Sequence, residues 1–132
     1  MRWCLGPLAA CMLASFAQAQ ECAAPAKSML RAELMFGRTI GGRLGVTEAR
    51  WADFVARELT PRFPDGLSVF DARGQWRTPS GAVVREPSKI VLIVTANDTA
   101  ARTRLDEAAA AYKQRFRQQS VGIVTGAVCA AF

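Results

Sequence analysis

Histidine is absent from this chain of 132 residues. Its absence excludes histidine-based catalytic triads, zinc sites with histidine ligands and acid–base catalysis by imidazole. Lysine is scarce, with only Lys27, Lys89 and Lys113, so arginine carries most of the positive charge. Internal repeats, dense basic tracts and long linkers are also missing. The sequence therefore predicts one small domain, and we expect no bound metal or cofactor.

The first 19 residues have the pattern of a cleavable export signal. Arg2 supplies a positive charge, an apolar run covers residues 3–16, and Ala-Gln-Ala follows at residues 17–19. The run is shorter than the roughly 20 apolar residues that a membrane-spanning helix needs. Cleavage after Ala19 leaves 113 of the 132 residues, with 16 basic against 11 acidic side chains and a net charge of +5. We expect this mature form in the periplasm or outside the cell.

Residues 8–11, Leu-Ala-Ala-Cys, offer an alternative because they match the lipobox of bacterial lipoproteins. Lipidation of Cys11 would anchor the protein to a membrane. Only ten residues precede Cys11, and the apolar run continues to Phe16, so cleavage after Ala19 fits better. The lipidated form remains the alternative.

Cleavage reduces the four cysteines to two, Cys22 and Cys129. In an oxidising compartment such a pair predicts a disulfide. Two thiolates without histidine are too few ligands for a typical zinc site, and no imidazole is present to activate a catalytic cysteine.

Hydrophobic periodicity predicts four strands in the mature chain. Residues 30–36 alternate between apolar and polar, which indicates a strand with one buried face. Residues 67–73 form a second strand, and Thr-Pro-Ser-Gly at 78–81 turns a hairpin whose return arm is interrupted by Pro87. The apolar run 90–94 predicts a central strand, and residues 121–125 a last one.

Two helices are predicted between these strands. Thr47 caps the first helix, which ends at Thr60 because a residue before proline avoids helical dihedral angles. Asp98 caps the second. The inner face of the second helix comprises Ala101, Leu105, Ala108, Tyr112 and Phe116.

The order strand, helix, strand, strand, helix, strand predicts an α+β fold of ferredoxin-like topology. Its four-stranded antiparallel sheet carries both helices on one face. Residues 20–29 form a lead-in segment, and residues 30–132 form a single domain. Because the last strand pairs antiparallel with the first, this topology brings Cys129 close to Cys22, in agreement with the predicted disulfide.

Several sequence motifs of the chain resemble those of one protein family. They are Phe-Gly-Arg at 36–38, Thr-Pro-Arg-Phe-Pro-Asp-Gly at 60–66, Asp-Ala-Arg-Gly-Gln-Trp-Arg at 71–77 and Arg-Glu-Pro-Ser-Lys at 85–89. The chain resembles the exported bacterial proteins grouped as domain of unknown function 3574. The resemblance spans nearly the whole mature chain. It implies the fold and the exported location, and it carries over no catalytic residues.

A glycine-rich loop at residues 37–45 joins a strand to a helix, where backbone amides can hold an anion. Gly37 and Gly42 have P-loop spacing, but Arg43-Leu44 replaces the required Lys-Ser/Thr. A plain flexible connection is the commoner meaning of such a loop. The candidate anion-binding residues are Arg38, Gly41, Gly42 and Arg43.

The face of the sheet away from the helices is the second candidate. There Arg31 and Glu33 point outward, and Lys89 joins them if Ile90, Leu92 and Val94 face inward. This face fits a homodimer interface or a ligand cleft, although a salt-bridge cluster without a ligand is the commoner arrangement. The candidate pocket residues are Arg31, Glu33, Lys89 and Tyr112.

Function is left open by these residues. Trp76 beside Arg77 on the hairpin suits recognition, but a tryptophan there commonly just packs over the hairpin. Nucleic-acid binding is excluded because the first strand has no aromatic pair for base stacking. We expect a binding or structural module without a catalytic motif. The alternatives are a small cofactor-independent enzyme with a sheet-face pocket, and an inhibitor or chaperone-like module for a secreted protein.

Overall fold

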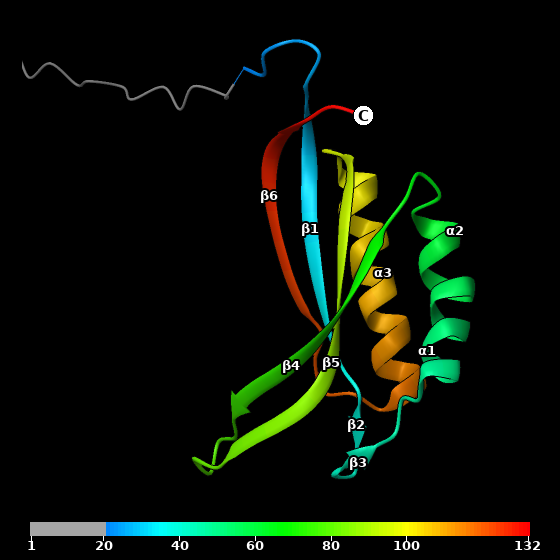
Figure 1. The fold of residues 1–132 in the computed structure, drawn as a ribbon, viewed down its shortest axis with the longest axis vertical. Coiled ribbons are helices and arrows are strands. Elements are labelled where there is room, and N and C mark those ends of the chain that lie inside the picture. The colour runs from blue at the N-terminus through cyan, green and yellow to red at the C-terminus, as the bar shows by residue number, and fades with distance from the viewer. Residues whose placement is uncertain (1–20) are drawn as a thin grey trace, which may run out of the picture.

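A computed structural model describes residues 21–132, so the predicted signal peptide and Cys11 lie outside the described residues. Apart from a short hairpin within the predicted glycine-rich loop, strands and helices follow each other in the predicted order (Figure 1). The elements are β1 (Lys27–Gly37), β2 (Thr39–Ile40), β3 (Arg43–Leu44), α1 (Glu48–Phe54), a π-helical turn η1 (Val55–Leu59), α2 (Thr60–Arg62), β4 (Ser68–Arg77), β5 (Val83–Ala96), α3 (Thr99–Phe116) and β6 (Gly122–Ala130).

The main sheet has the strand order β4-β5-β1-β6, and all neighbouring strands are antiparallel. Both helical segments pack on one side of it (Figure 1). This arrangement confirms the predicted α+β fold. Ser28 pairs with Cys129 where β1 meets β6, and Cys22 bonds to Cys129 with a Cα–Cα distance of 5.5 Å. The predicted disulfide is therefore present. Within residues 21–132 no helix is long and apolar enough to cross a membrane.

The core lies between the sheet and the helices. Alternate residues of β1 point into it, and Leu30, Ala32, Leu34 and Phe36 are fully buried, as the period of two predicts. The Asp98 side chain accepts a hydrogen bond from the Ala101 amide at 2.7 Å, which confirms the predicted cap of α3. The predicted inner face of α3 is buried along its whole length. The aromatic residues Phe36, Trp51, Phe54, Tyr112 and Phe116 form one cluster, with ring centroids of neighbouring pairs 4.7–6.1 Å apart.

The orientation of β5 differs from the prediction. Lys89, Val91 and Ile93 face the helices and are at most 5% exposed. Lys89 pairs with Phe36 and Ile93 with Ala32, and residues paired across neighbouring strands point to the same face. The run from Ile90 to Val94 is apolar throughout. A period of two cannot choose a face in such a run, so only the pairing with β1 decides it.

Pro87 does not interrupt the strand as predicted, because β5 runs continuously from Val83 to Ala96. β1 ends at Gly37, opposite Ser88, and the Pro87 carbonyl accepts a hydrogen bond from the Arg38 amide at 3.0 Å. Pro87 therefore lies just past the last residue pair between β1 and β5, where no backbone N–H is required from β5. A proline at that position breaks no ladder bond.

The first helix also continues one turn past its predicted end at Thr60, to Arg62. In a regular helix the ring of Pro61 would clash with the carbonyl four residues earlier. Here η1 precedes the proline, and the Thr60 amide bonds to the Val55 carbonyl five residues back. This wider turn gives the proline ring room. The helix therefore carries Phe63 into the core, where it is 4% exposed.

Candidate functional site

The end of β4, residues 73–77, and the start of β5, residues 83–87, form a two-stranded arm that leaves the body of the molecule (Figure 1). A cleft of about 790 Å³ lies at its base, on the open side of the sheet. We call it the arm cleft. Its walls come from the arm, the end of β1, the turn between β2 and β3, and the loop that follows α3.

Glu86 lines the arm cleft. Its carboxylate accepts hydrogen bonds from the Trp76 indole N–H and from the Thr39 amide, each at 3.2 Å. A Cβ atom at Gly37 would lie only 2.7 Å from the nearer carboxylate oxygen, so any larger residue at that position would displace the Glu86 carboxylate. The carboxylate is thus held in place by its surroundings before any ligand arrives.

Apolar and amide groups surround this carboxylate. Trp76 is 45% exposed and Met35 is 40% exposed, so the indole and the thioether offer apolar contact area. The Gln118 side chain donates to the Thr39 carbonyl at 2.8 Å and thereby ties the loop after α3 to β2. An exposed indole face beside a fixed carboxylate suits a flat ligand that carries hydrogen-bond donors.

The four candidate pocket residues are not brought together. Arg31 and Glu33 do lie on the open face, where they pair with each other at 2.6 Å. Lys89 lies on the opposite face of the sheet, and Tyr112 lies in the core. A shared acid–base site of these residues is therefore not formed.

Lys89 belongs to a partly buried ionic cluster under the start of α1. Its ammonium group donates to Asp71 and, at 2.9 Å, to Glu48, which also pairs with Arg38 at 2.6 Å. Burial alone would lower the pKa of Lys89, but the hydrogen bonds to the two carboxylates outweigh it and raise this pKa above its ordinary value. A lysine held charged in this way is no nucleophile near neutral pH.

Hydrogen bonding to Lys89 lowers the pKa values of Asp71 and Glu48 from their ordinary 3.8 and 4.5. A carboxyl group whose pKa is lower in the folded state than in the unfolded chain stabilises the fold when the pH is above its unfolded-state pKa. This contribution to the unfolding free energy is lost as the pH falls through the folded-state pKa. We expect Lys89→Met to flatten the fall in unfolding free energy below about pH 4.5. Urea unfolding between neutral and acidic pH measures the slope, and equal slopes for both proteins would contradict the assignment.

Tyr112 has a structural position. Its hydroxyl donates to the Gly37 carbonyl at 2.7 Å, and burial raises the pKa of this phenol above its ordinary value. The bond lies directly behind the arm cleft, because Gly37 adjoins Glu86 from the other side. Tyr112 thus holds the end of β1 in place and does not reach the cleft.

The candidate anion loop forms a small hairpin of β2 and β3. Gly41 and Gly42 occupy its turn with φ angles of 58° and 77°, a conformation that favours glycine. The buried Arg38 precedes β2, donates to the Val46 carbonyl at 2.8 Å and pairs with Glu48, whereas Arg43 is exposed on β3. The two arginines therefore do not converge on one anion.

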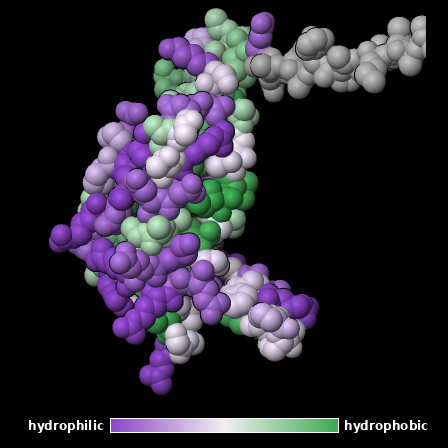
Figure 2. All heavy atoms as spheres, turned by 180° about the vertical axis from the view of Figure 1, so that it is seen from behind, coloured by the Kyte–Doolittle hydropathy of each residue, from purple (hydrophilic) through white to green (hydrophobic). Residues whose placement is uncertain are grey.

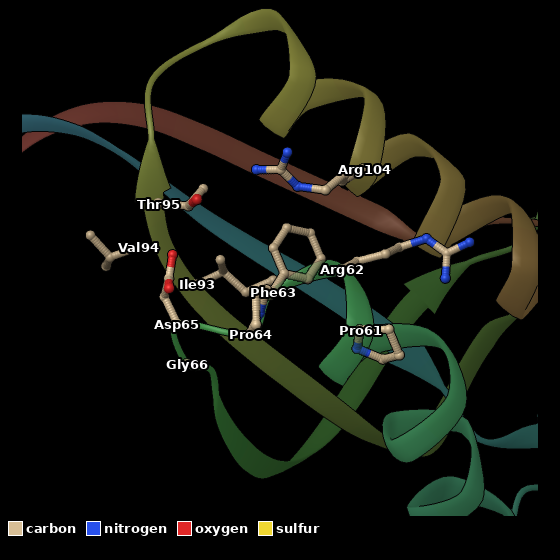
Figure 3. Close-up of a pocket in the computed structure, with 10 residues that line it drawn as sticks. All are labelled: Pro61, Arg62, Phe63, Pro64, Asp65, Gly66, Ile93, Val94, Thr95 and Arg104. Carbon is tan, nitrogen blue, oxygen red and sulfur yellow. The ribbon is translucent and has the colours of Figure 1, made fainter.

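A second hollow, of about 310 Å³, lies where α2 ends beside β5 and α3 (Figure 3). The Arg104 guanidinium stands over the Phe63 ring, 5.9 Å from its centroid. Arg62 is directed away from Thr95 and pairs with Glu58 at 2.7 Å. Among residues 21–132, Arg104 is thus the one cation directed into this hollow, and the Asp65 carboxylate also lines it and opposes the binding of an anion. The hollow is therefore a weaker candidate than the arm cleft.

Glu86 is the functional candidate that sequence reasoning missed. The turn at residues 78–81 pairs Arg77 with Val83, and counting back along the arm places Gly74 opposite Glu86, two positions from Trp76. This pairing of Gly74 with Glu86 requires the return strand of the hairpin to stay regular up to Pro87. The sequence instead predicts an interruption at Pro87, so Glu86 is not recognised as a partner of the arm. Within residues 21–132 no group of three or more cysteine, aspartate or glutamate side chains forms a metal site.

The match to a protein family covers nearly the same residues as the predicted domain 30–132. Residues 31–132 match the family described as a protein of unknown function, DUF3574. The chain belongs to this family. The family match confirms the resemblance that the motifs indicate. No curated protein matches the chain by sequence.

Solved structures with a similar fold come from distant proteins. A phage SAM lyase, solved in complex with S-methyl-5'-thioadenosine, has 18% identity and a TM-score of 0.60, covering 88% of this chain and 97% of its own. The apo state gives 15% identity and a TM-score of 0.61 over 87% and 98% of the two chains. CutA from Synechococcus elongatus has 14% identity and a TM-score of 0.54 over 80% and 82%. At these identities the similarity establishes the fold alone.

Proposed function

We propose that this member of DUF3574 is an exported binding module that takes a small, flat ligand in the arm cleft. The observation that carries the proposal is the meeting of a half-exposed indole and a fixed carboxylate in a space of about 790 Å³. Small-molecule sites typically measure roughly 300–1,000 Å³ and combine apolar walls with a few polar groups. The export signal and the Cys22–Cys129 disulfide support a periplasmic or secreted location.

The chemistry of the cleft limits the ligand class. The indole N–H of Trp76 is engaged by Glu86, so its ring face remains for stacking. Glu86 has acceptor capacity left for an amine, an amidine or a hydroxyl group of the ligand. We therefore expect aromatic or heterocyclic compounds with amino groups, and a nucleoside such as S-methyl-5'-thioadenosine is one probe, because the phage SAM lyase of similar fold binds it.

Tryptophan fluorescence tests the proposal. Removal of residues 1–19 leaves Trp51 and Trp76 as the only tryptophans, and Trp51 is 5% exposed, so quenching by a ligand reports on Trp76. We expect a probe from a panel of aromatic amines and nucleosides to bind. Trp76→Ala should weaken binding by about fivefold to 160-fold, because loss of stacking on an aromatic side chain costs roughly 1–3 kcal/mol.

Val83→Ala is the matched control. Val83 is 40% exposed on the same arm, but it sits one position away from Val84, the partner of Trp76, and so on the opposite face. Calorimetry, which needs no indole signal, compares the variants with the wild type. Equal affinity of Trp76→Ala and the wild type, or no binding across the panel, would contradict the proposal.

A further inference from the structure

The open face of the sheet is unusually apolar for a surface that faces solvent. Figure 2 shows hydrophilic residues over the helical side and hydrophobic colouring on the side of the strands. Phe70 and Val124 are 51% and 54% exposed on this face. The apolar residues that share it include Met35, Phe70, Leu92, Val94, Val124 and Val128. Patches of this kind mark interaction surfaces.

Two opposite charges lie in the middle of this apolar face. Arg31 and Glu33 are two residues apart on β1, a central strand of the sheet, and their side chains are 52% and 35% exposed. Each therefore remains accessible to a second molecule. A cation and an anion side by side are self-complementary, because a half-turn exchanges them.

We propose that a second copy of this chain covers the open face, related by a two-fold axis that passes beside Ala32 and across β1. Under this symmetry Arg31 of each copy lies opposite Glu33 of the other. An axis parallel to β1 would instead bring like charges together, which is unfavourable. The same rotation places Met35 opposite Met29 of the second copy, at the edge of the arm cleft. This inference goes beyond ligand binding and does not depend on it.

The size of the face agrees with a dimer. β1 pairs with each neighbouring strand over nine residues. The part of the open face over the body has nine residues of each of β6, β1 and β5, and the five residues of β4 that pair with Ser88–Leu92. At about 4.8 Å between strands and roughly 3.3 Å per residue, these cover about 500 Å² per copy. The two copies together bury about 1,000 Å², which reaches the roughly 1,000 Å² that a specific interface needs.

Charge exchange between the two positions tests the arrangement. We expect the mature wild type to have a dimer mass in light scattering. Arg31→Glu leaves two acids at the centre of the face and Glu33→Arg leaves two bases, so each variant alone should dissociate at least tenfold more readily. An equimolar mixture of the two variants should recover the dimer, and so should the double variant Arg31→Glu with Glu33→Arg.

The mixture separates a contact between copies from a contact within one strand, because an intramolecular pair cannot be restored by mixing. Asp106→Arg, on the exposed side of α3, is the matched control and should leave the mass unchanged. Circular dichroism confirms that each variant folds. A monomeric wild type, a trimer, or a mixture of folded variants that stays monomeric would overturn the proposal. Ligand titration of the same samples is an independent readout, so failure of the arm cleft and failure of the dimer are distinguishable.

Discussion

Replacement of both disulfide cysteines, Cys22→Ser with Cys129→Ser, lowers the free energy of unfolding by about 4–5 kcal/mol in our expectation. The bond joins residues 107 positions apart and so closes nearly the whole mature chain. In the chain-entropy account a disulfide stabilises by restricting the unfolded chain, and the effect grows with loop length. Since small domains have unfolding free energies of roughly 5–15 kcal/mol, this loss is a large share of the total.

Urea unfolding of the mature domain measures this change. Reductant should destabilise the wild type to the level of the double serine variant and leave the variant itself unaffected. A loss of this size would agree with the proposed periplasmic or secreted location, because disulfides persist in oxidising compartments. Equal unfolding midpoints for wild type and variant would contradict the expected contribution.

Truncation of Tyr112 should have a similarly large effect. The side chain is fully buried, and its ring packs against Phe36, Phe54 and Phe116 with centroids 4.7–4.9 Å away. Removing a buried aromatic ring costs roughly 3–5 kcal/mol, so Tyr112→Ala should be strongly destabilised. Tyr112→Phe keeps the ring and loses only the hydrogen bond to Gly37, at a cost of about 1 kcal/mol.

The pH dependence distinguishes the hydroxyl from the ring. Burial raises the pKa of Tyr112 in the folded state above the value of 10.0 expected for the unfolded chain. A raised folded pKa means stability that is complete below about pH 10 and is lost as the pH rises beyond it. The difference in unfolding free energy between wild type and Tyr112→Phe should therefore shrink above pH 10. A difference that stays constant up to pH 11 would contradict the buried phenol.

Much of the fold could be read from local patterns. The alternation in residues 30–36, the cap at Asp98 and the spacing of apolar residues along α3 each match the structure, because each depends only on near neighbours. The disulfide was also predictable, since it needs only two cysteines and the strand order. The errors fall at Pro61 and Pro87, where a proline normally ends an element. A π-helical turn and the end of a neighbouring strand remove the usual cost at these positions.

The candidate site was much less accessible to sequence reasoning. The apolar run that follows Lys89 has no alternation, so the sequence cannot choose the face of this residue, and only its pairing with Phe36 turns it toward the helices. Glu86 gains its role from Trp76, Thr39 and Gly37, which the fold brings to one place from three segments of the chain.

By itself, then, the sequence determined the order of the elements, the inner face of β1 and α3, and the cysteine pairing. These follow from periodicity, capping and topology, which act over short distances or are set by chain order. The tertiary structure alone decided which face of β5 is buried, which charges pair, and where a cleft opens. Those features depend on the register between strands and on contacts between distant residues, and a shift of one residue would reverse them.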